Sequence, residues 1–339
     1  MTRELRVAVL GGSGFLGRHL CTAFAADGHQ VLSVSRRPGP DSVRSAQLDL
    51  TLASAEDLVA LFTAEGTTTV VNAAGAVWGG PSEEDMIAAN LRVVERLLEA
   101  MAQLPSVPRL VQLGTVHEYG VVPDGVRIAE DRPCQPIAPY GRTKLAATTA
   151  ILDTAACGRV PGVVLRIGNV VGPGLPTASL LGGIAGKLAE AADSGTPAVL
   201  ALPPMNARRD FVDVRDVAAA VVAAATAPVS GKVLNIGRGE AVDAGTLVAE
   251  LVAASGVPAQ RTETAATGKP APGGAATASQ LIDITAAAAL LGWKPRHGLE
   301  DSMRAVWREA SPPGGRKQPA GRTRRPDRTR NSMTGSDVT

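Results

Sequence analysis

This chain of 339 residues has few aromatic side chains, few cysteines and little net charge. Aromatic residues make up 3%, so a buried core has to be built from Ala, Val, Leu and Ile. Cys21, Cys134 and Cys157 are too few and too scattered for a disulfide framework or a metal site, so a reducing compartment is the simplest setting. The formal charge of +2 is close to balance and argues neither for nor against a polyanionic partner. We expect no nucleic-acid partner.

Long apolar runs are also missing. No stretch approaches the roughly 20 apolar residues of a membrane span, and the first residues lack the apolar centre of a signal peptide. We therefore expect a cytoplasmic protein that does not bind membranes. With 45% hydrophobic and 19% charged residues, the composition is that of a globular protein, and the length suits one unit with two lobes.

Short apolar runs alternate with stretches of helical spacing. This alternation predicts an α/β fold, with helices on both faces of a parallel sheet, and a doubly wound Rossmann sheet is the leading choice. The expected strands are 6–10, 30–34, 69–72, 109–113, 162–166 and 232–236, and the expected helices include 15–26, 84–102, 140–152 and 213–227.

A glycine-rich turn at residues 11–17 joins the first expected strand to the first expected helix. Gly11 permits a tight turn, Gly14 lets the backbone approach a pyrophosphate, and Gly17 lets the helix pack close to the sheet. The free N–H groups of the helix N-terminus then suit phosphate groups. A turn without a ligand is the weaker interpretation, because strand, turn and helix follow in the order of a dinucleotide site. The expected cofactor contacts here are Gly11, Ser13, Gly14, Phe15, Leu16 and Gly17.

The end of the second expected strand bears on the choice of cofactor. An NAD site usually has an acidic residue here, which accepts a hydrogen bond from the ribose 2′-hydroxyl. In this chain Ser35 stands at that place and Arg36 and Arg37 follow. Guanidinium groups suit a 2′-phosphate, so the sequence favours NADP(H), with NAD(H) possible. The alternative is that both arginines are solvated surface residues.

Other cofactor contacts are expected along the same edge of the sheet. Asp49-Leu50 lies where a loop can accept a hydrogen bond from the adenine amino group. Ala73, Ala74 and Gly75 follow the expected strand 69–72, and their small size would let the ribose and nicotinamide pass close by. We also expect Asn90 to contact the cofactor.

The composition changes along the second half of the chain. After about residue 172 the alternation loosens and Pro and Gly become frequent. We expect residues 1–172 to form the dinucleotide-binding domain, with 209–237 returning to it. Residues 173–208 and 238–308 are expected to form a smaller C-terminal substrate-binding lobe. Residues 311–339 contain many Arg, Pro, Gly and Ser, and are expected to form a disordered basic tail of open role.

Tyr140 and Lys144 lie four residues apart in an expected helix, so they share one face, one turn apart. A free tyrosine has a pKa near 10. A nearby ammonium group stabilises the phenolate, so we expect Lys144 to lower the pKa of Tyr140. Such a pair is common by chance, but downstream of a dinucleotide turn it predicts that Tyr140 is a proton donor or acceptor assisted by Lys144.

These motifs resemble the extended short-chain dehydrogenase/reductase superfamily, in its NAD(P)-dependent sugar-nucleotide epimerase/dehydratase branch. Residues 114–120 look like the Ser/Thr segment that ends in Tyr-Gly in that family, and 166–173 look like its Arg-x-x-Asn-x-x-Gly-Pro segment. Residues 209–214 are similar to its Arg-Asp-Phe-Val segment, and 291–295 to its Leu-Gly-Trp-x-Pro ending. The chain departs from the pattern at Leu10, where Thr is frequent, at Gly114, where Ser is common, and at Asp213, where His is frequent.

The resemblance implies roles for particular residues. Thr115, Tyr140 and Lys144 would be the catalytic residues: Thr115 bonds the reacting oxygen, Tyr140 transfers its proton, and Lys144 also holds the nicotinamide ribose. Asn169 and Arg209 would contact the sugar and the diphosphate of the substrate, with a purely structural bond as the alternative for each. His117 would contact the sugar; a second acid/base or a packing role stays open.

The residues after Thr115 limit the kinds of reaction to be expected. Dehydratases of the family carry Asp-Glu there, whereas this chain has Val116 and His117, so water elimination is not expected. A preference for NADPH would favour net reduction. We expect a 4-ketoreductase that acts on a nucleotide-linked 4-keto-6-deoxyhexose, with dTDP as the nucleotide, in bacterial deoxysugar or antibiotic biosynthesis. We also expect a homodimer, as is common among related enzymes. The alternatives are an NDP-sugar 4-epimerase with tightly bound NAD and an inactive NADP-binding regulator.

Overall fold

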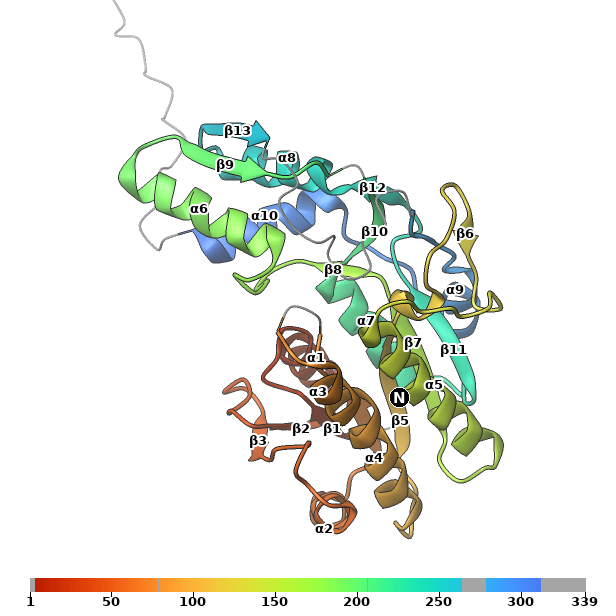
Figure 1. The fold of residues 1–339 in the computed structure, drawn as a ribbon. Coiled ribbons are helices and arrows are strands. Elements are labelled where there is room, and N and C mark those ends of the chain that lie inside the picture. The colour runs from red at the N-terminus through yellow and green to blue at the C-terminus, as the bar shows by residue number, and fades with distance from the viewer. Residues whose placement is uncertain (1–3, 78–79, 206, 264–278, 312–339) are drawn as a thin grey trace, which may run out of the picture.

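A seven-stranded parallel sheet forms the centre of the molecule (Figure 1). The structure is a computed structural model and describes residues 4–77, 80–205, 207–263 and 279–311. In spatial order the strands of the sheet are β11 (Lys232–Ile236), β7 (Gly162–Ile167), β5 (Arg109–Thr115), β4 (Thr69–Asn72), β1 (Arg6–Leu10), β2 (Gln30–Ser35) and β3 (Arg44–Gln47).

Helices cover both faces of this sheet, because its strands are apolar on both sides. Val7 and Val9 of β1 pack into one apolar cluster together with α1 (Phe15–Ala26) and α7 (Val214–Thr226). Ala8 and Leu10, which point the other way, pack into a second cluster. That cluster is completed by α2 (Ala55–Glu65), α4 (Val93–Ala102) and α5 (Pro139–Ala156). The predicted doubly wound α/β fold is therefore confirmed.

The order of the strands creates a crevice at one edge. β1 pairs with β2 on one side and with β4 on the other, so the chain builds the sheet outward in both directions from β1. The connections that leave β1 and β4 then turn to opposite faces, and the carboxyl ends of the two strands border an open crevice. The glycine turn at residues 11–17 lies directly at this point.

The predicted strands are confirmed, but three details differ from the sequence prediction. Strand β3 was not expected, since its polar sequence Arg-Ser-Ala-Gln lies exposed at the edge of the sheet. The expected helix 84–102 is divided into α3 (Glu83–Ile87), a π-helical segment at Ala88–Arg92 and α4. Strand β5 continues to Thr115, which places that residue at the carboxyl edge of the sheet.

A second group of elements packs around its own apolar cluster, which includes Leu188, Leu200, Leu251 and Met303. Figure 1 shows this group in the upper part of the view, apart from α2 and α4. This group of elements is the smaller lobe that the predicted fold class includes. Its elements are α6 (Leu180–Ser194), β9 (Ala198–Leu202), α8 (Ala244–Ser255), β13 (Ala259–Glu263) and α10 (Leu299–Ala310). Other elements are β6 (Arg127–Ile128), β8 (Asn169–Val171), β10 (Arg208–Asp213), β12 (Ala241–Asp243), β14 (Leu281–Ile282) and α9 (Thr285–Leu291).

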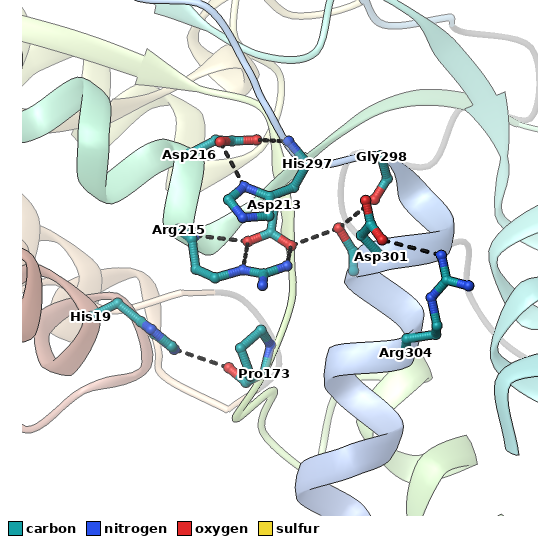
Figure 2. A network of polar contacts seen from close by, with 10 residues as sticks. His19, Pro173, Asp213, Arg215, Asp216, His297, Gly298, Asp301 and Arg304 are labelled. Atoms are coloured by element: carbon teal, nitrogen blue, oxygen red, sulfur yellow. Dashed lines mark hydrogen bonds and ion pairs between the residues drawn. The ribbon is translucent and has the colours of Figure 1, made fainter.

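Buried carboxylates connect the start of α7 to the C-terminal segment (Figure 2). Asp213 accepts two hydrogen bonds of 2.8 Å from the guanidinium of Arg215 and one of 2.6 Å from the hydroxyl of Ser302 on α10. Asp216 lies 2.8 Å from the ring Nδ1 of His297. Burial by itself raises the pKa of Asp213, but the bonds from Arg215 and Ser302 outweigh it and hold the pKa below its usual value.

Two other sequence expectations concern the C-terminal tail and the absence of a membrane span. The expected basic tail at 311–339 lies outside the described residues, apart from Ser311. Among the residues that the structure describes, no helix is both long and apolar enough to cross a membrane.

Candidate active site

The glycine turn between β1 and α1 has the shape that a pyrophosphate needs. Gly11 has φ +79°, and a Cβ there would lie 2.9 Å from the backbone nitrogen of Ala74. A Cβ on Gly17 would lie 2.0 Å from the carbonyl oxygen of Gly11, so only glycine lets α1 approach so closely. Gly14 is the N-cap of α1 and has no side chain to bond the first N–H groups. These residues therefore fit a dinucleotide, with phosphate oxygens as partners of the helix N-terminus.

The expected adenosine end lies at the carboxyl ends of β2 and β3. The hydroxyl of Ser35 donates to the carbonyl of Arg37 at 2.8 Å and shapes the loop, while Arg36 and Arg37 are exposed. Asp49 accepts from the hydroxyl and the backbone N–H of Thr51, and these bonds, with a smaller effect of Arg36, lower its pKa. Exposed guanidinium groups thus lie next to the expected ribose position. The geometry fits a 2′-phosphate, and the preference for NADP(H) stays a prediction.

A cavity of about 320 Å³ opens at the carboxyl edge of β4, β5 and β7. It brings together residues from segments that lie far apart in the chain. The predicted site residues that line it are Leu16, Ala73, Ala74, Gly75, Asn90, Thr115, His117, Tyr140, Lys144 and Asn169. The lining also includes residues that were not among the predicted site residues, namely Ala76, Val77, Leu113, Gly114, Ile167, Gly168 and Val170.

Tyr140 and Lys144 face this cavity from the first turns of α5. Pro139 occupies the first turn of the helix, where its fixed φ is favourable and its missing N–H is not needed. The ammonium of Lys144 donates to the carbonyl of Leu113 at 2.6 Å, and the hydroxyl of Thr115 is hydrogen-bonded to Tyr140. Thr115, Tyr140 and Lys144 therefore meet as the sequence motif predicts.

The pKa of Tyr140 differs from the sequence expectation. Burial raises it to about 12; the hydrogen bond from Thr115 opposes this, and the charge of Glu118 adds to it. Burial also lowers the pKa of Lys144 to about 8, against the charge of Glu118. The net shift of the Tyr140 pKa is therefore upward, opposite to the lowering expected from Lys144, because loss of hydration disfavours the phenolate.

His117 lies against Tyr140 in an edge-to-face arrangement, with ring centroids 6.1 Å apart. Burial lowers the pKa of His117 to about 4, and the positive charge of Arg209 contributes to this lowering. The imidazole is therefore neutral at pH 7, with one N–H donor and one acceptor nitrogen. A neutral ring suits hydrogen bonding to a sugar, and it is not a proton donor of the imidazolium kind at neutral pH.

Two asparagines of the cavity wall are already bonded to protein groups. Asn90, in the π-helical segment, accepts from the N–H of Ala76 and donates to the carbonyl of Ala76 and to Thr143. It thereby fixes the loop after β4 against α5. Asn169 donates to the carbonyl of Asp210 at 3.1 Å and to Gln280 at 2.8 Å. The structural bond considered for Asn169 is present, and direct contacts of either residue with a ligand stay predictions.

Sequence reasoning assigned no role to Glu118, which lies directly beneath this site. Its carboxylate is fully buried and accepts from the backbone N–H of Thr115 at 2.9 Å. Together the two residues form a capping box for the short 3₁₀ helix at Val116–Tyr119. A Thr followed by Glu three residues later is the sequence signature of that motif, so this bond was recognisable in the sequence.

Comparison with known proteins agrees with this geometry. Residues 7–237 match the NAD dependent epimerase/dehydratase family. The chain is 46% identical, over 90% of its length and 96% of the relative, to a dTDP-6-deoxy-L-talose 4-dehydrogenase (NAD(P)(+)) of Kitasatospora kifunensis.

Solved structures of related enzymes superpose over most of the chain. The UDP-glucose 4-epimerase of Thermus thermophilus in complex with NAD has a TM-score of 0.76 and 28% identity, covering 90% of this chain and 98% of its own. MoeE5 in complex with UDP-glucuronic acid and NAD has a TM-score of 0.77 and 30% identity, covering 89% and 98%. From its matched residues, its fold and its glycine turn, the chain belongs to the NAD-dependent epimerase/dehydratase family of extended short-chain dehydrogenases/reductases, and is an NAD(P)-dependent enzyme.

Proposed function

We propose that this protein is a 4-ketoreductase that uses NADPH to reduce a dTDP-linked 4-keto-6-deoxyhexose. The observation that carries the proposal is the meeting of Thr115, Tyr140 and Lys144 at one cavity beside the glycine turn. The relative named as a 4-dehydrogenase of a dTDP-6-deoxyhexose supports it, because dehydrogenation of a hydroxyl at carbon 4 is the reverse of ketone reduction there. The residues after Thr115 lack the acid pair of an elimination reaction, which also favours simple reduction.

Each residue of this group has a defined task in the proposed reaction. The nicotinamide, when bound, supplies the hydride. Tyr140, whose raised pKa keeps it protonated at neutral pH, donates its proton to the carbonyl oxygen, which becomes the new hydroxyl. Thr115 orients that phenol and the carbonyl oxygen of the sugar, and Lys144 holds the ribose of the cofactor. His117 offers a neutral hydrogen-bonding group to the sugar.

The remaining elements of the proposal concern how the ligands are held. Residues 1–172 with 209–237 bind the cofactor, and 173–208 with 238–308 bind the sugar nucleotide, which agrees with the separate apolar cluster around α6, α8 and α10. Arg36 and Arg37 bind the 2′-phosphate, and Arg209 binds the diphosphate. The protein is proposed to act as a cytoplasmic homodimer in deoxysugar biosynthesis for an antibiotic or another glycoside.

Purified protein, a dTDP-4-keto-6-deoxyhexose and NADPH test the proposal directly. We expect loss of NADPH absorbance in step with substrate consumption, one equivalent for each sugar reduced, and formation of a dTDP-6-deoxyhexose. The Tyr140→Phe variant, handled in parallel, shows whether the observed oxidation of NADPH belongs to this site. No consumption of NADPH or NADH with any 4-ketosugar nucleotide would reject a reductase.

A 4-epimerase is the second candidate, favoured by the likeness to the UDP-glucose 4-epimerase with NAD. Incubation with an NDP-hexose and no added cofactor separates the two functions. An epimerase would carry NAD through purification and interconvert the two hydroxyl configurations. A reductase would leave the NDP-hexose unchanged, since it needs a stoichiometric supply of reduced cofactor.

A further inference from the structure

Glu118 is a fully buried acid that the proposed reaction does not use directly. It lies in the 3₁₀ helix at Val116–Tyr119, just after β5. A carboxylate loses its hydration when it is buried, so it is retained in a core only where partners satisfy its oxygens. The partners of Glu118 come from three separate elements of the active site.

The first partner is Thr115 itself, whose backbone N–H donates to Oε1 at 2.9 Å. The second is Thr148 on α5, one turn beyond Lys144, whose hydroxyl donates to Oε2 at 2.9 Å. The third is Arg166 on β7, whose Nε donates to Oε2 at 2.8 Å in a buried ion pair. One carboxylate thus joins the end of β5, the helix that carries Tyr140 and Lys144, and the neighbouring strand.

The charged and titratable groups around Glu118 are few and can be named. Arg166, from β7, also stacks over the ring of Tyr119 at 4.5 Å, and Glu130 faces Tyr119 as well. Lys144 and Tyr140 face the carboxylate from α5, and Cys134 from the loop that precedes α5. His117 on the same 3₁₀ helix is neutral at pH 7.

Besides accepting hydrogen bonds, the carboxylate of Glu118 affects the pKa of Lys144. Burial disfavours the ammonium form of Lys144 and lowers its pKa, and Glu118 is the negative charge that opposes burial. The value of about 8 that results leaves little margin above neutral pH. Without the carboxylate, burial would act on Lys144 unopposed.

We propose that Glu118 is a positioning residue for the reaction proposed above: through Thr115, Thr148 and Arg166 it fixes the catalytic group, and its charge keeps Lys144 an ammonium ion at neutral pH. The proposal rests on the proposed function only for the task of Lys144. The link between the two side chains is a property of the folded chain and can be measured without substrate.

The test compares Glu118→Gln, which keeps the shape and removes the charge, with Thr148→Val, which removes one hydrogen bond and keeps the charge. NMR titration of lysine side chains labelled with carbon-13 at Cε gives the pKa of Lys144, assigned by its loss in Lys144→Met. We expect Glu118→Gln to lower the pKa of Lys144 by about one pH unit or more, the effect of one charge at close range in a protein interior. Thr148→Val should leave it unchanged.

Activity gives an independent readout that a purely structural role would not move. In Glu118→Gln the limb of the pH profile for kcat that reports Lys144 should shift to lower pH by the same amount, with turnover recovering toward the wild-type value as pH falls. If Glu118→Gln does not fold, the double variant Glu118→Gln/Arg166→Gln removes both buried charges together. A lowering of the Lys144 pKa is still expected there, because the charge that opposes burial at Lys144 is that of Glu118.

Three outcomes decide the matter. A lowered Lys144 pKa in Glu118→Gln alone, with the parallel shift in kcat, supports the proposal. An unchanged Lys144 pKa in a folded variant, or an equal shift in Thr148→Val, overturns it. If the wild-type protein reduces no ketosugar while the Lys144 pKa still responds to Glu118, the proposed function fails and the link between Glu118 and Lys144 stands.

Discussion

Tyr140, Lys144 and His117 share one cavity, and each loses hydration there. Burial is the largest cause of the pKa shift of all three: it raises that of Tyr140 to about 12 and lowers those of Lys144 and His117 to about 8 and 4. Burial disfavours whichever form is charged, so a phenol and a base move in opposite directions. At neutral pH the cavity therefore presents a protonated phenol and a neutral imidazole to the substrate, beside an ammonium group.

Replacing Tyr140 with Phe tests the proton donor at this scale. Phe retains the ring that packs against His117 but has no proton to give. We expect turnover to fall by at least about 10²-fold, because general acid catalysis contributes roughly 10²–10⁴-fold. Fluorescence titration with NADPH should show nearly unchanged affinity. Turnover close to that of the wild type would remove Tyr140 from the proposed mechanism.

Exposed guanidinium groups allow a second test, on cofactor choice. In the variant Arg36→Ala/Arg37→Ala we expect the Kd for NADPH to rise by about tenfold or more and the Kd for NADH to change little, because only NADPH has the 2′-phosphate. Arg44→Ala is the matched control. Arg44 is also exposed, but it lies at the first residue of β3, away from the carboxyl ends of the strands, and it pairs with Glu65. An equal loss of affinity for both cofactors would argue against a bound 2′-phosphate.

At the scale of elements, a helix cap and an ion pair join α7, which packs against the central sheet, to the segment that contains α10. Asp213 caps α7 and accepts a hydrogen bond from Ser302 on α10 (Figure 2). One carboxylate therefore holds α7, which packs on the central sheet, to α10. Asp216 binds His297 in the segment between α9 and α10. The same figure shows the pair of Asp301 and Arg304 on α10, and both side chains are more than half exposed.

The variant Asp213→Asn should lower the free energy of unfolding by about 2–4 kcal/mol at pH 7, because the fully buried carboxylate loses the charge that strengthens its hydrogen bonds from Arg215 and Ser302. The pKa of Asp213 is lowered in the folded protein, so its contribution is complete above its unfolded pKa and is lost as pH falls through the folded pKa. The difference from wild type, measured by urea unfolding, should therefore shrink in strong acid.

Asp301→Asn is the control for that experiment. Its side chain is 57% exposed and its pair with Arg304 is solvated, so the unfolding midpoint should change little. If both variants lowered the midpoint equally, the connection between α7 and α10 would not be the source of the effect.

At the scale of the whole molecule, the cavity collects residues from β5, from α5 and from the consecutive strands β7 and β8, three stretches that lie apart in the sequence. The strand order explains this arrangement, because parallel strands present all their carboxyl ends at one edge. The glycine turn, the Thr115 segment and the start of α5 all follow or face that edge. Local motifs therefore identified most of the cavity without any knowledge of the distances between them.

Edge and boundary features were less predictable. Strand β3 has polar residues and pairs on one side only, so its sequence has no apolar period to reveal it. Asn90, in the π-helical segment, bonds to Ala76 and Thr143, which are distant in the chain. Glu118 carried a local capping signature, but its bonds to Thr148 and Arg166 depend on the packing of α5 and β7.

The sequence by itself determined the alternation of strands and helices, the glycine turn and the spacing of Tyr140 and Lys144, because each of these is a local property of the chain. Only the tertiary structure decided the protonation states in the cavity and the partners of the buried carboxylates. Hydration is lost through contacts with residues from many segments, and the pKa of Tyr140 rose for that reason although a lysine stands one turn away. Spacing brings two side chains near each other, whereas packing decides which charged forms they can adopt.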